Sequence, residues 1–153
     1  MAHATALVAA DFGEPEDRLW QMLRGRFGTI EPVPATDPVG AVSALRAYLA
    51  GRLDALDGLP VDAGGTPFQR EVWATLRTIP AGVTWSYKRL AEAIGRPAAV
   101  RAVGLANGTN PIGIVVPCHR VIGADGSLTG YGGGLPRKRW LLEHEGVLLR
   151  IGA

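Results

Sequence analysis

The sequence predicts an α+β or α/β chain in two parts: a small mixed sheet-and-helix N-terminal domain over residues 1–63 and a mainly helical C-terminal domain over residues 66–153. Three observations predict this division. Apolar residues recur at helical spacing in several separate segments. The stretch 59–65 has the composition of a linker. The charge changes sign beyond it, since residues 1–65 carry 5 basic and 9 acidic side chains, and residues 66–153 carry 11 and 5.

The N-terminal segment predicts one strand and two helices. Residues 6–10 form a short apolar run that indicates a strand. The spacing of leucine and aromatic residues predicts a helix from Pro15 to Phe27, and a second amphipathic helix is predicted from Val39 to Leu53. The loop between the helices is marked by Pro32, Pro34 and Pro38. This segment lacks a cluster of cysteine and histidine ligands, so no metal and no other cofactor is expected.

Length and composition restrict the class of protein. With 153 residues, 47% of them hydrophobic, the chain can bury a core, which excludes disordered and collagen-like proteins. Its apolar runs are shorter than the roughly 18 residues of a membrane span, and its N-terminus lacks a signal-peptide pattern. A single cysteine excludes an internal disulfide and suits a reducing compartment. We therefore expect a cytoplasmic protein without a membrane partner.

A helix is predicted to open the C-terminal domain. Thr66 is the expected N-cap and Pro67 the first helical residue, and the apolar spacing from Phe68 to Leu76 gives the helix one buried face. The stretch 79–82 is predicted to stop it, because it contains both proline and glycine.

Two further helices follow, joined by a tight turn. Ser86 is expected to cap a short helix through Ile94, residues 95–97 form the turn, and a helix rich in small residues spans Ala98 to Asn107. This order fits a helix-turn-helix. A pair of packed helices with no role in DNA binding fits the residues alone at least as well.

The only cysteine, Cys118, stands where a predicted strand gives way to a loop. Val115 and Val116 indicate a short buried strand, and Pro117 ends it because proline cannot donate to a ladder. His119 follows directly, and a thiol beside a potential base suggests a nucleophile. The alternative is a small buried hydrophobic residue, which is the commoner role of a lone cysteine.

Glycine-rich segments follow the cysteine. Residues 123–127 predict a turn, and residues 130–134 predict a loop whose backbone can approach a flat ligand closely, or else a flexible hairpin tip. Residues 136–146 then predict a helix with proline at its start and glycine at its end. Glu145 lies in the last turn of this helix.

Ordered motifs over residues 66–146 closely resemble the O6-alkylguanine-DNA alkyltransferases, also called methylated-DNA-protein-cysteine methyltransferases. The resemblance rests on several motifs at family spacing. They are Thr66-Pro67-Phe68-Gln69, Val72-Trp73, Asn110-Pro111-Ile112, Pro117-Cys118-His119-Arg120-Val121-Ile122-Gly123, Gly130-Tyr131, Gly133-Gly134-Leu135, Lys138, Trp140-Leu141-Leu142 and Glu145-Gly146. The C-terminal domain is then expected to be winged helix-turn-helix-like and to carry the active site. The N-terminal domain is expected to be shortened, without the first strands of the family.

The resemblance implies DNA repair by direct reversal of damage. The alkyl group of O6-alkylguanine, and of O4-alkylthymine, would pass irreversibly to Cys118 after the base is flipped out of double-stranded DNA. Extrusion is required because a reactive carbon inside the base stack is out of reach of any side chain. The partner is double-stranded DNA, contacted through its minor groove by the helix 98–107. The protein would act as a monomer and be consumed by one reaction.

The resemblance implies catalytic roles for five residues. Cys118 is the nucleophile, His119 acts on it through water, and Glu145 holds the histidine. Asn110 ties the recognition helix to the active-site segment, with a simple turn residue as its alternative role. Tyr87 crowds the target phosphate and offers its hydroxyl to the leaving base; a half-buried core tyrosine is the alternative.

It also implies contacts to the DNA and to the flipped base. The expected DNA-binding residues are Arg101, Tyr87, Ala102 and Arg120. Arg101 would fill the gap left by the extruded nucleotide, unless it only makes a surface salt bridge. The expected pocket residues are Val121, Tyr131, Gly132 and Pro117, and the pocket would be looser than usual because the family commonly has a larger residue at Gly132. His144 is expected to cap a helix end rather than to react.

Two other classes of protein compete with this interpretation. A binding-only relative would sense alkylated bases without repairing them, but such relatives replace the cysteine, and Cys118 is present. An unrelated cysteine hydrolase would need an oxyanion site and multiple turnovers.

Overall fold

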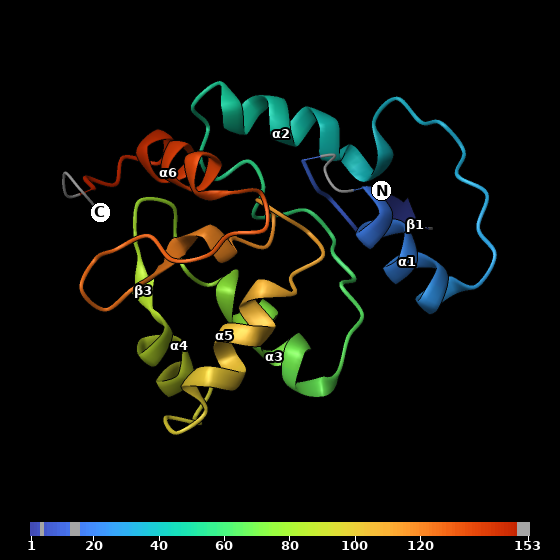
Figure 1. Cartoon of the computed structure of the whole chain (residues 1–153). Helices are drawn as coiled ribbons and strands as arrows, with labels where there is room; N and C mark the ends of the chain where they lie inside the picture. Colours follow the sequence, from blue (N-terminus) through green and yellow to red (C-terminus); the bar gives the residue numbers. More distant parts are fainter. Residues whose placement is uncertain (4, 13–15, 150–153) are drawn as a thin grey trace.

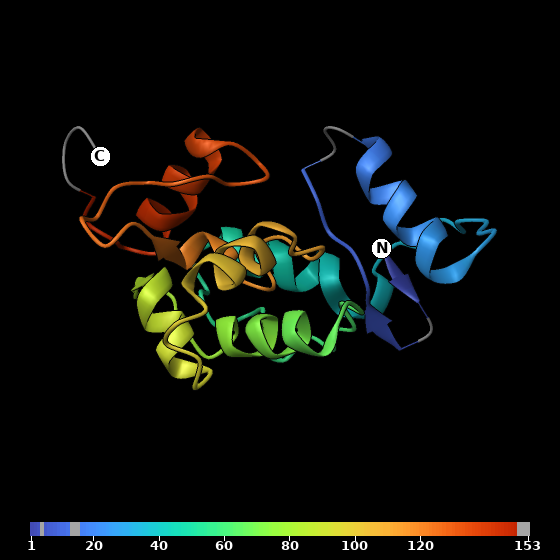
Figure 2. The ribbon, with the colours of Figure 1, turned by 60° about the horizontal axis from the view of Figure 1, so that its bottom comes forward.

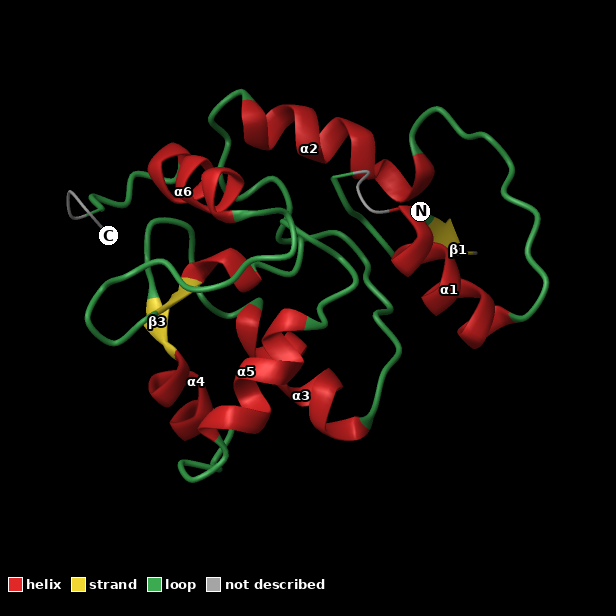
Figure 3. Cartoon of the chain, viewed as in Figure 1, coloured by secondary structure: helices red, strands yellow, loops and turns green. Residues whose placement is uncertain are grey.

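The computed structural model describes residues 1–3, 5–12 and 16–149. Helices and loops make up most of these residues, and the strands are short (Figure 3). β1 (Ala2–His3) pairs antiparallel with β2 (Ala6–Leu7), and β3 (Trp85–Ser86) pairs in parallel with β4 (Val121–Ile122). The predicted α+β class with a mainly helical C-terminal part is confirmed.

The N-terminal part has the predicted strand and two helices, but these elements begin or end at other residues than predicted. α1 (Glu16–Phe27) lies within the predicted helix, whose expected first residue Pro15 falls outside the described residues. The strand expected over 6–10 is only the two-residue β2, followed by an isolated bridge from Ala10 to Ile112. The 3-10 turn Pro38–Gly40 leads into α2 (Ala41–Leu49). α2 ends before the predicted Leu53, because Gly51 adopts a φ of 107° and its N–H returns to the Tyr48 carbonyl.

Capping residues start the first two helices of the C-terminal part, as the sequence predicts. α3 (Pro67–Leu76) begins with a capping box, in which the Thr66 hydroxyl accepts from the Gln69 N–H and the Gln69 side chain accepts from the Thr66 N–H. α4 (Tyr87–Ala93) begins at Ser86, whose hydroxyl accepts from the Arg89 N–H. These bonds satisfy N–H groups that have no partner within the helix.

The third helix of this group, α5 (Val100–Gly108), begins two residues later than predicted. The Ala99 N–H donates to the Arg96 carbonyl, so the residues before Val100 belong to the turn. α5 packs against both α3 and α4, and the three helices lie together in two views (Figures 1 and 2). The helix-turn-helix arrangement predicted for this segment is therefore present.

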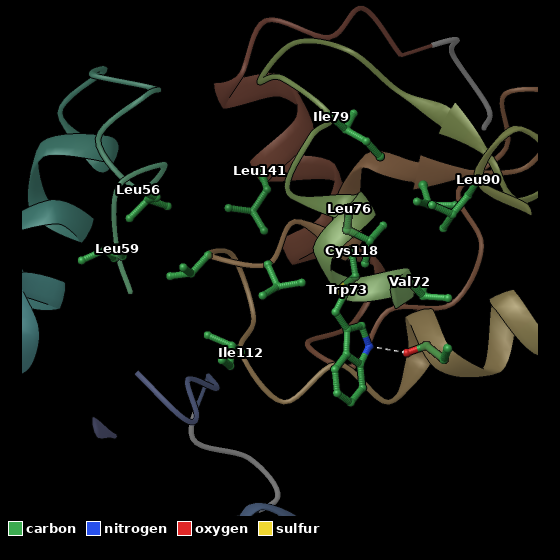
Figure 4. Packing of buried hydrophobic residues seen from close by; sticks show 14 of the residues in the cluster. Leu56, Leu59, Val72, Trp73, Leu76, Ile79, Leu90, Ile112, Cys118 and Leu141 are labelled. Atoms are coloured by element: carbon green, nitrogen blue, oxygen red, sulfur yellow. Dashed lines mark hydrogen bonds between the residues drawn. The ribbon is translucent and has the colours of Figure 1, made fainter. Parts of the chain in front are cut away.

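The main hydrophobic core runs through both parts of the chain. It joins Leu7 and Tyr48 of the N-terminal part to Trp73 of α3 and to Leu141 of α6 (Leu135–His144). Figure 4 shows the cluster, in which the Trp73 indole N–H donates to the Ala106 carbonyl of α5 at 2.8 Å. A second, smaller cluster lies under α1. The boundary between residues 63 and 66 stays a prediction, since the main core crosses it.

The strand predicted at Val115–Val116 is wrong. Both residues are buried, as expected, but they lie in a turn. Ile114 adopts a φ of 68°, and the Val116 N–H returns to the Ile112 carbonyl at 3.0 Å. A backbone that bonds to itself in this way cannot form a ladder with another strand.

The chain then reaches the 3-10 turn η2 (Cys118–Arg120), β4 and the predicted turn at residues 123–127. The loop 130–134 follows, and it leads into α6. Gly146 takes a φ of 86° just past the end of this helix, as its predicted C-terminal position requires. Within the described residues, none of the helices has the length and apolar character needed to cross a membrane.

Candidate active site

Asn110 holds the segment that leads to the cysteine. Its Oδ1 accepts from the Ile112 N–H at 2.9 Å, and its Nδ2 donates to the Val116 carbonyl at 2.7 Å. Because Asn110 follows directly on the end of α5, these two bonds fix the turn before Cys118 relative to that helix. They also satisfy backbone groups that a strand ladder would otherwise have to satisfy.

Cys118 begins η2, with only 8% of its surface exposed. Burial raises the pKa of its thiol, while a hydrogen bond from Asn110 and the nearby Lys138 cation oppose that rise. Cys118 lines a cavity of about 490 Å³, together with Asn110, Tyr131, Gly132 and Phe12. A buried thiol facing a cavity can meet a ligand that enters from outside, but a base is needed to ionise it.

Glu145 is the centre of a buried hydrogen-bond network behind the cysteine. Its Oε1 accepts from His119 Nε2 at 2.9 Å, from Arg120 Nη2 at 2.8 Å and from the Tyr48 hydroxyl at 2.8 Å. Its Oε2 accepts from Arg120 Nε at 3.0 Å. Burial alone would raise the pKa of Glu145, but its hydrogen bonds from His119 and Arg120 bring it down to about 2. The carboxylate is therefore ionised throughout the physiological range.

His119 has the protonation pattern of a general base. Since the ionised Glu145 can only accept, Nε2 must carry the proton of the neutral ring, and Nδ1 keeps its lone pair. Nδ1 is buried and bonds to none of the described residues. Burial lowers the pKa of His119, and Glu145 partly offsets this. The imidazole is thus neutral before the reaction, and Glu145 stabilises the imidazolium that forms when the ring takes up a proton.

Lys138 is a buried cation close to the site that the predicted set of site residues omitted. Its Nζ donates to the Val121 carbonyl at 2.7 Å and to the Thr129 carbonyl at 3.0 Å. Burial lowers its pKa to about 8. A signal was present in the sequence, because Lys138 and Glu145 share the helical face of Leu141 and Leu142 at spacings of three, four and seven.

Tyr48 and Asn107 were also missed. Tyr48 comes from α2, and it carried no signal because an amphipathic helix ordinarily buries one such aromatic. Asn107 of α5 is buried, lines the cavity and donates to the Cys118 carbonyl at 3.5 Å. A polar residue on the inner face of a helix of small residues was its only sign in the sequence.

α5 presents a small-residue surface to the solvent. Arg101 and Ala102 are exposed and Leu105 is 68% exposed, whereas Val103 and Ala106 are buried. Among the residues that the structure describes, no carboxylate forms an ion pair with Arg101, so its surface salt-bridge alternative is not observed. Among the described residues of this face, Arg101 is an exposed cation at the start of the helix, an arrangement that fits a groove in a polyanion.

Tyr87 stands at the start of α4, beside this face. It is half-buried, and its hydroxyl shares a hydrogen bond of 2.7 Å with the Thr129 hydroxyl. The Tyr87 ring lies beside Gly104 of α5, where an added Cβ atom would be in ordinary van der Waals contact with the ring at 3.7 Å. Tyr87 therefore connects α5 with the loop that precedes the glycine-rich segment.

Comparison with known proteins agrees with this site. Residues 67–147 match the family model described as 6-O-methylguanine DNA methyltransferase, DNA binding domain. The methylated-DNA--protein-cysteine methyltransferase of Shigella flexneri is 57% identical over 145 residues, covering 94% of this chain and 85% of that protein. This chain belongs to the methylated-DNA-protein-cysteine methyltransferase family.

Solved structures of similar proteins share the fold. The structure of Mycobacterium tuberculosis OGT in complex with DNA has a TM-score of 0.79 and 48% identity, with 95% of this chain and 83% of that chain covered. The O6-methylguanine-DNA methyltransferase of Pyrococcus kodakaraensis has a TM-score of 0.70 and 34% identity, with 86% and 76% covered. Family membership thus covers nearly the whole chain, and the absence of the family's first strands stays a prediction.

Against this family background, the structure brings together Cys118, His119, Glu145 and Asn110, as predicted. It contradicts a DNA contact by Arg120. That guanidinium is buried, forms two bonds with Glu145 and donates to the Ile79 carbonyl. An arginine whose charge is already paired inside the core is not available to a phosphate.

The predicted pocket residues divide into two groups. Tyr131 and Gly132 line the cavity beside Cys118. Val121 and Pro117 are buried next to it and do not line it, and the Val121 carbonyl is occupied by Lys138. His144 caps a helix end, but of a different helix, because its Nε2 bonds to the Tyr48 carbonyl near the end of α2 at 2.8 Å.

Proposed function

We propose that this chain repairs DNA by transferring the alkyl group of an O6-alkylguanine to Cys118, once per molecule. The observation that carries the proposal is the buried series Cys118, His119 and Glu145 at the wall of a cavity, in a chain of the methylated-DNA-protein-cysteine methyltransferase family. The base of O4-alkylthymine carries the same kind of alkyl–oxygen bond and is a second substrate.

The reaction is a displacement at saturated carbon. The Cys118 sulfur forms a bond to the alkyl carbon as the bond from that carbon to O6 breaks, and the electron pair passes to the guanine, which takes up a proton. A thiolate is needed, and His119 Nδ1 is the group that takes the thiol proton through a water molecule. Glu145 stabilises the imidazolium that results, through the bond of 2.9 Å at Nε2.

The other site residues act on positioning and on the leaving base. Asn110 keeps the cysteine segment fixed to α5, and its side chain opposes the rise in the pKa of the Cys118 thiol. The Tyr87 hydroxyl, bonded to Thr129 at 2.7 Å, is the donor for the leaving guanine. Tyr131 and Gly132 border the base that enters the cavity. No metal or other cofactor has a role in this scheme.

The DNA would bind along the exposed face of α5 through its minor groove. Arg101 enters the space that the extruded nucleotide leaves, while Ala102 and its small neighbours allow the helix to approach the backbone. The protein acts as a monomer in the cytoplasm, where its DNA substrate lies and a free thiol persists.

The product sets the stoichiometry. A thioether has no good leaving group, and the described residues place no second cysteine near Cys118 to release the alkyl chain. Each molecule therefore reacts once. This separates the proposal from a cysteine hydrolase, which regenerates its thiol.

The test is the mass of the intact protein after incubation with a duplex containing one O6-methylguanine. We expect the addition of one methyl group, located on the Cys118 peptide, and no addition to Cys118→Ser. A reaction that continues beyond one equivalent would indicate a hydrolase. Tight binding without any gain in mass would indicate a binding-only relative.

A further inference from the structure

Among the described residues of the N-terminal part of the chain, Tyr48 is the one that bonds to Glu145. It lies on α2, 97 positions before Glu145, and is fully buried. Its hydroxyl donates to Glu145 Oε1 at 2.8 Å, the same oxygen that accepts from His119 Nε2 at 2.9 Å. Together with Arg120 Nη2, which bonds to the same atom at 2.8 Å, three donors meet on one carboxylate oxygen, and Tyr48 is the one from a distant part of the chain.

The hydroxyl of Tyr48 can only act as a donor in this position. The carboxylate has no proton to give, and burial together with the negative charge of Glu145 raises the pKa of Tyr48, so the phenol stays protonated. Each hydrogen bond to a carboxylate withdraws part of its charge and lowers its attraction for another proton donor. Tyr48 and His119 thus compete for the charge of Oε1.

We propose that Tyr48 is a positioning residue that sets the proton affinity of His119 through Glu145. The inference rests on the proposed function, because His119 is taken as the base that activates Cys118. By withdrawing charge from Oε1, Tyr48 weakens the stabilisation of the His119 imidazolium. The imidazole therefore stays neutral, and able to accept the thiol proton, down to a lower pH than it would without the Tyr48 hydroxyl.

Arg120 allows the effect of Tyr48 on the charge of Glu145 to be separated from any role of Tyr48 in holding the carboxylate in place. Its guanidinium contacts both oxygens of Glu145, Nη2 to Oε1 at 2.8 Å and Nε to Oε2 at 3.0 Å. A bidentate contact of this kind fixes the plane of the carboxylate. Removing the Tyr48 hydroxyl therefore changes the charge on Oε1 while the carboxylate stays in place.

The remaining charged and titratable groups around the network come from three elements. Arg120 of η2 and Lys138 of α6 lower the pKa of His119, and Cys118 lies beside them. Tyr131 of the glycine-rich loop acts electrostatically on Tyr48. All of them are retained when only Tyr48 or His144 is changed, so a difference between variants reports on the altered contact.

The experiment measures the second-order rate of transfer from the free base O6-benzylguanine as a function of pH. The free base needs no DNA binding, and the acid limb of such a profile reports the pKa of the catalytic base. We expect Tyr48→Phe to move the acid-side midpoint up by about half a pH unit. A hydrogen bond changes a carboxylate pKa by about one unit, and part of that reaches the imidazole.

A matched control and an opposite perturbation sharpen the test. His144→Gln removes a ring that packs edge-on against the Tyr48 ring at 5.1 Å and alters the bond to the Tyr48 carbonyl, but it keeps the Tyr48 hydroxyl on Glu145. It controls for loosened packing around Tyr48, so its midpoint stays at the wild-type value even if its stability falls. Replacement of Tyr48 by 3-fluorotyrosine keeps the ring and strengthens the donor, so its midpoint moves down. This second variant provides the answer if Tyr48→Phe does not fold.

Three results overturn the inference: an unchanged midpoint in Tyr48→Phe, a downward shift in that variant, or an equal shift in His144→Gln. When Tyr48→Phe does not fold, an unchanged or raised midpoint with 3-fluorotyrosine overturns it instead. Failure of the proposed function is distinct, because the wild-type protein would then transfer no benzyl group to Cys118 at any pH.

Discussion

Replacing Glu145 by glutamine removes the charge that holds the buried network together. The hydrogen bonds from His119 and Arg120 keep the Glu145 pKa at about 2 instead of the ordinary 4.5. One pKa unit corresponds to about 1.4 kcal/mol, so the ionised carboxylate stabilises the fold by about 3 kcal/mol at neutral pH. Loss of one partner of a buried ion pair costs a similar 3–5 kcal/mol, because Arg120 would be left buried and unpaired.

Urea unfolding at pH 7 measures this loss. For a chain of this size, about 3 kcal/mol corresponds to a fall in Tm of roughly 6–12 °C. The matched control is Glu143→Gln, which lies on the same helix and only approaches Arg139 at 3.8 Å with both side chains partly exposed. A pair of this kind contributes at most about 1 kcal/mol. The control should therefore remain close to the wild-type stability.

The pH dependence gives the sign of the effect. Because the folded-state pKa of Glu145 is depressed, its contribution is fully present above about 4.5 and is lost as the pH falls towards 2. The stability difference between wild type and Glu145→Gln should shrink in that window. A difference below about 1 kcal/mol at pH 7, or one that does not shrink in acid, would refute the assignment of Glu145 as the charged centre.

Glu145→Gln should also slow alkyl transfer by about 100-fold, the lower end of what general-base catalysis contributes. DNA affinity should stay near the wild-type value, because Glu145 is buried away from the exposed face of α5. Single-turnover rates and binding are compared below the unfolding temperature of the variant. An unchanged rate would reduce Glu145 to a structural residue.

Two further predictions concern the DNA face and the buried lysine. Arg101→Ala should slow the repair of duplex DNA strongly and the transfer from free O6-benzylguanine little, because only the duplex requires base extrusion. Tyr87→Phe should slow transfer from both substrates. Equal losses of rate for Arg101→Ala on the two substrates would reject its role in flipping. Lys138→Met should become less stable relative to wild type as the pH rises from 8 to about 10.5. The depressed Lys138 pKa of about 8 means that the unfolded wild-type chain binds more protons in this range, so the wild type alone gains stability there. Unfolding curves at several pH values test this, and a constant difference would contradict it.

Local chemistry made part of the fold predictable. Thr66 and Ser86 were identified as caps because their hydroxyls satisfy helix N–H groups within three residues, which requires no knowledge of distant contacts. Gly146 was identified as the end of α6 for the same kind of reason. The series Cys118, His119 and Glu145 was predicted from the resemblance to the alkyltransferase family, and the structure brings its members together.

The errors have a local and a distant cause. Val115 and Val116 have strand-like side chains, but the bond from Asn110 to the Val116 carbonyl, six positions on, holds this segment in a turn, as the alternative turn role of Asn110 would allow. Arg120 was predicted to contact DNA, but its guanidinium pairs with Glu145, 25 positions away in sequence, and no local pattern marks that contact. Tyr48 was missed because its partner lies still further along the chain.

The wide separation of the partners of Glu145 has a consequence for protein synthesis. His119 and Glu145 are 26 positions apart, and Tyr48 and Glu145 are 97 apart. On the ribosome, the thiol of Cys118 therefore emerges well before Glu145 can reach His119. The nascent cysteine then behaves as an ordinary thiol with a pKa near 8.5, in contact with water. Transfer by the proposed mechanism therefore becomes possible only after α6, the last helix of the chain, has been made and has placed Glu145 against His119.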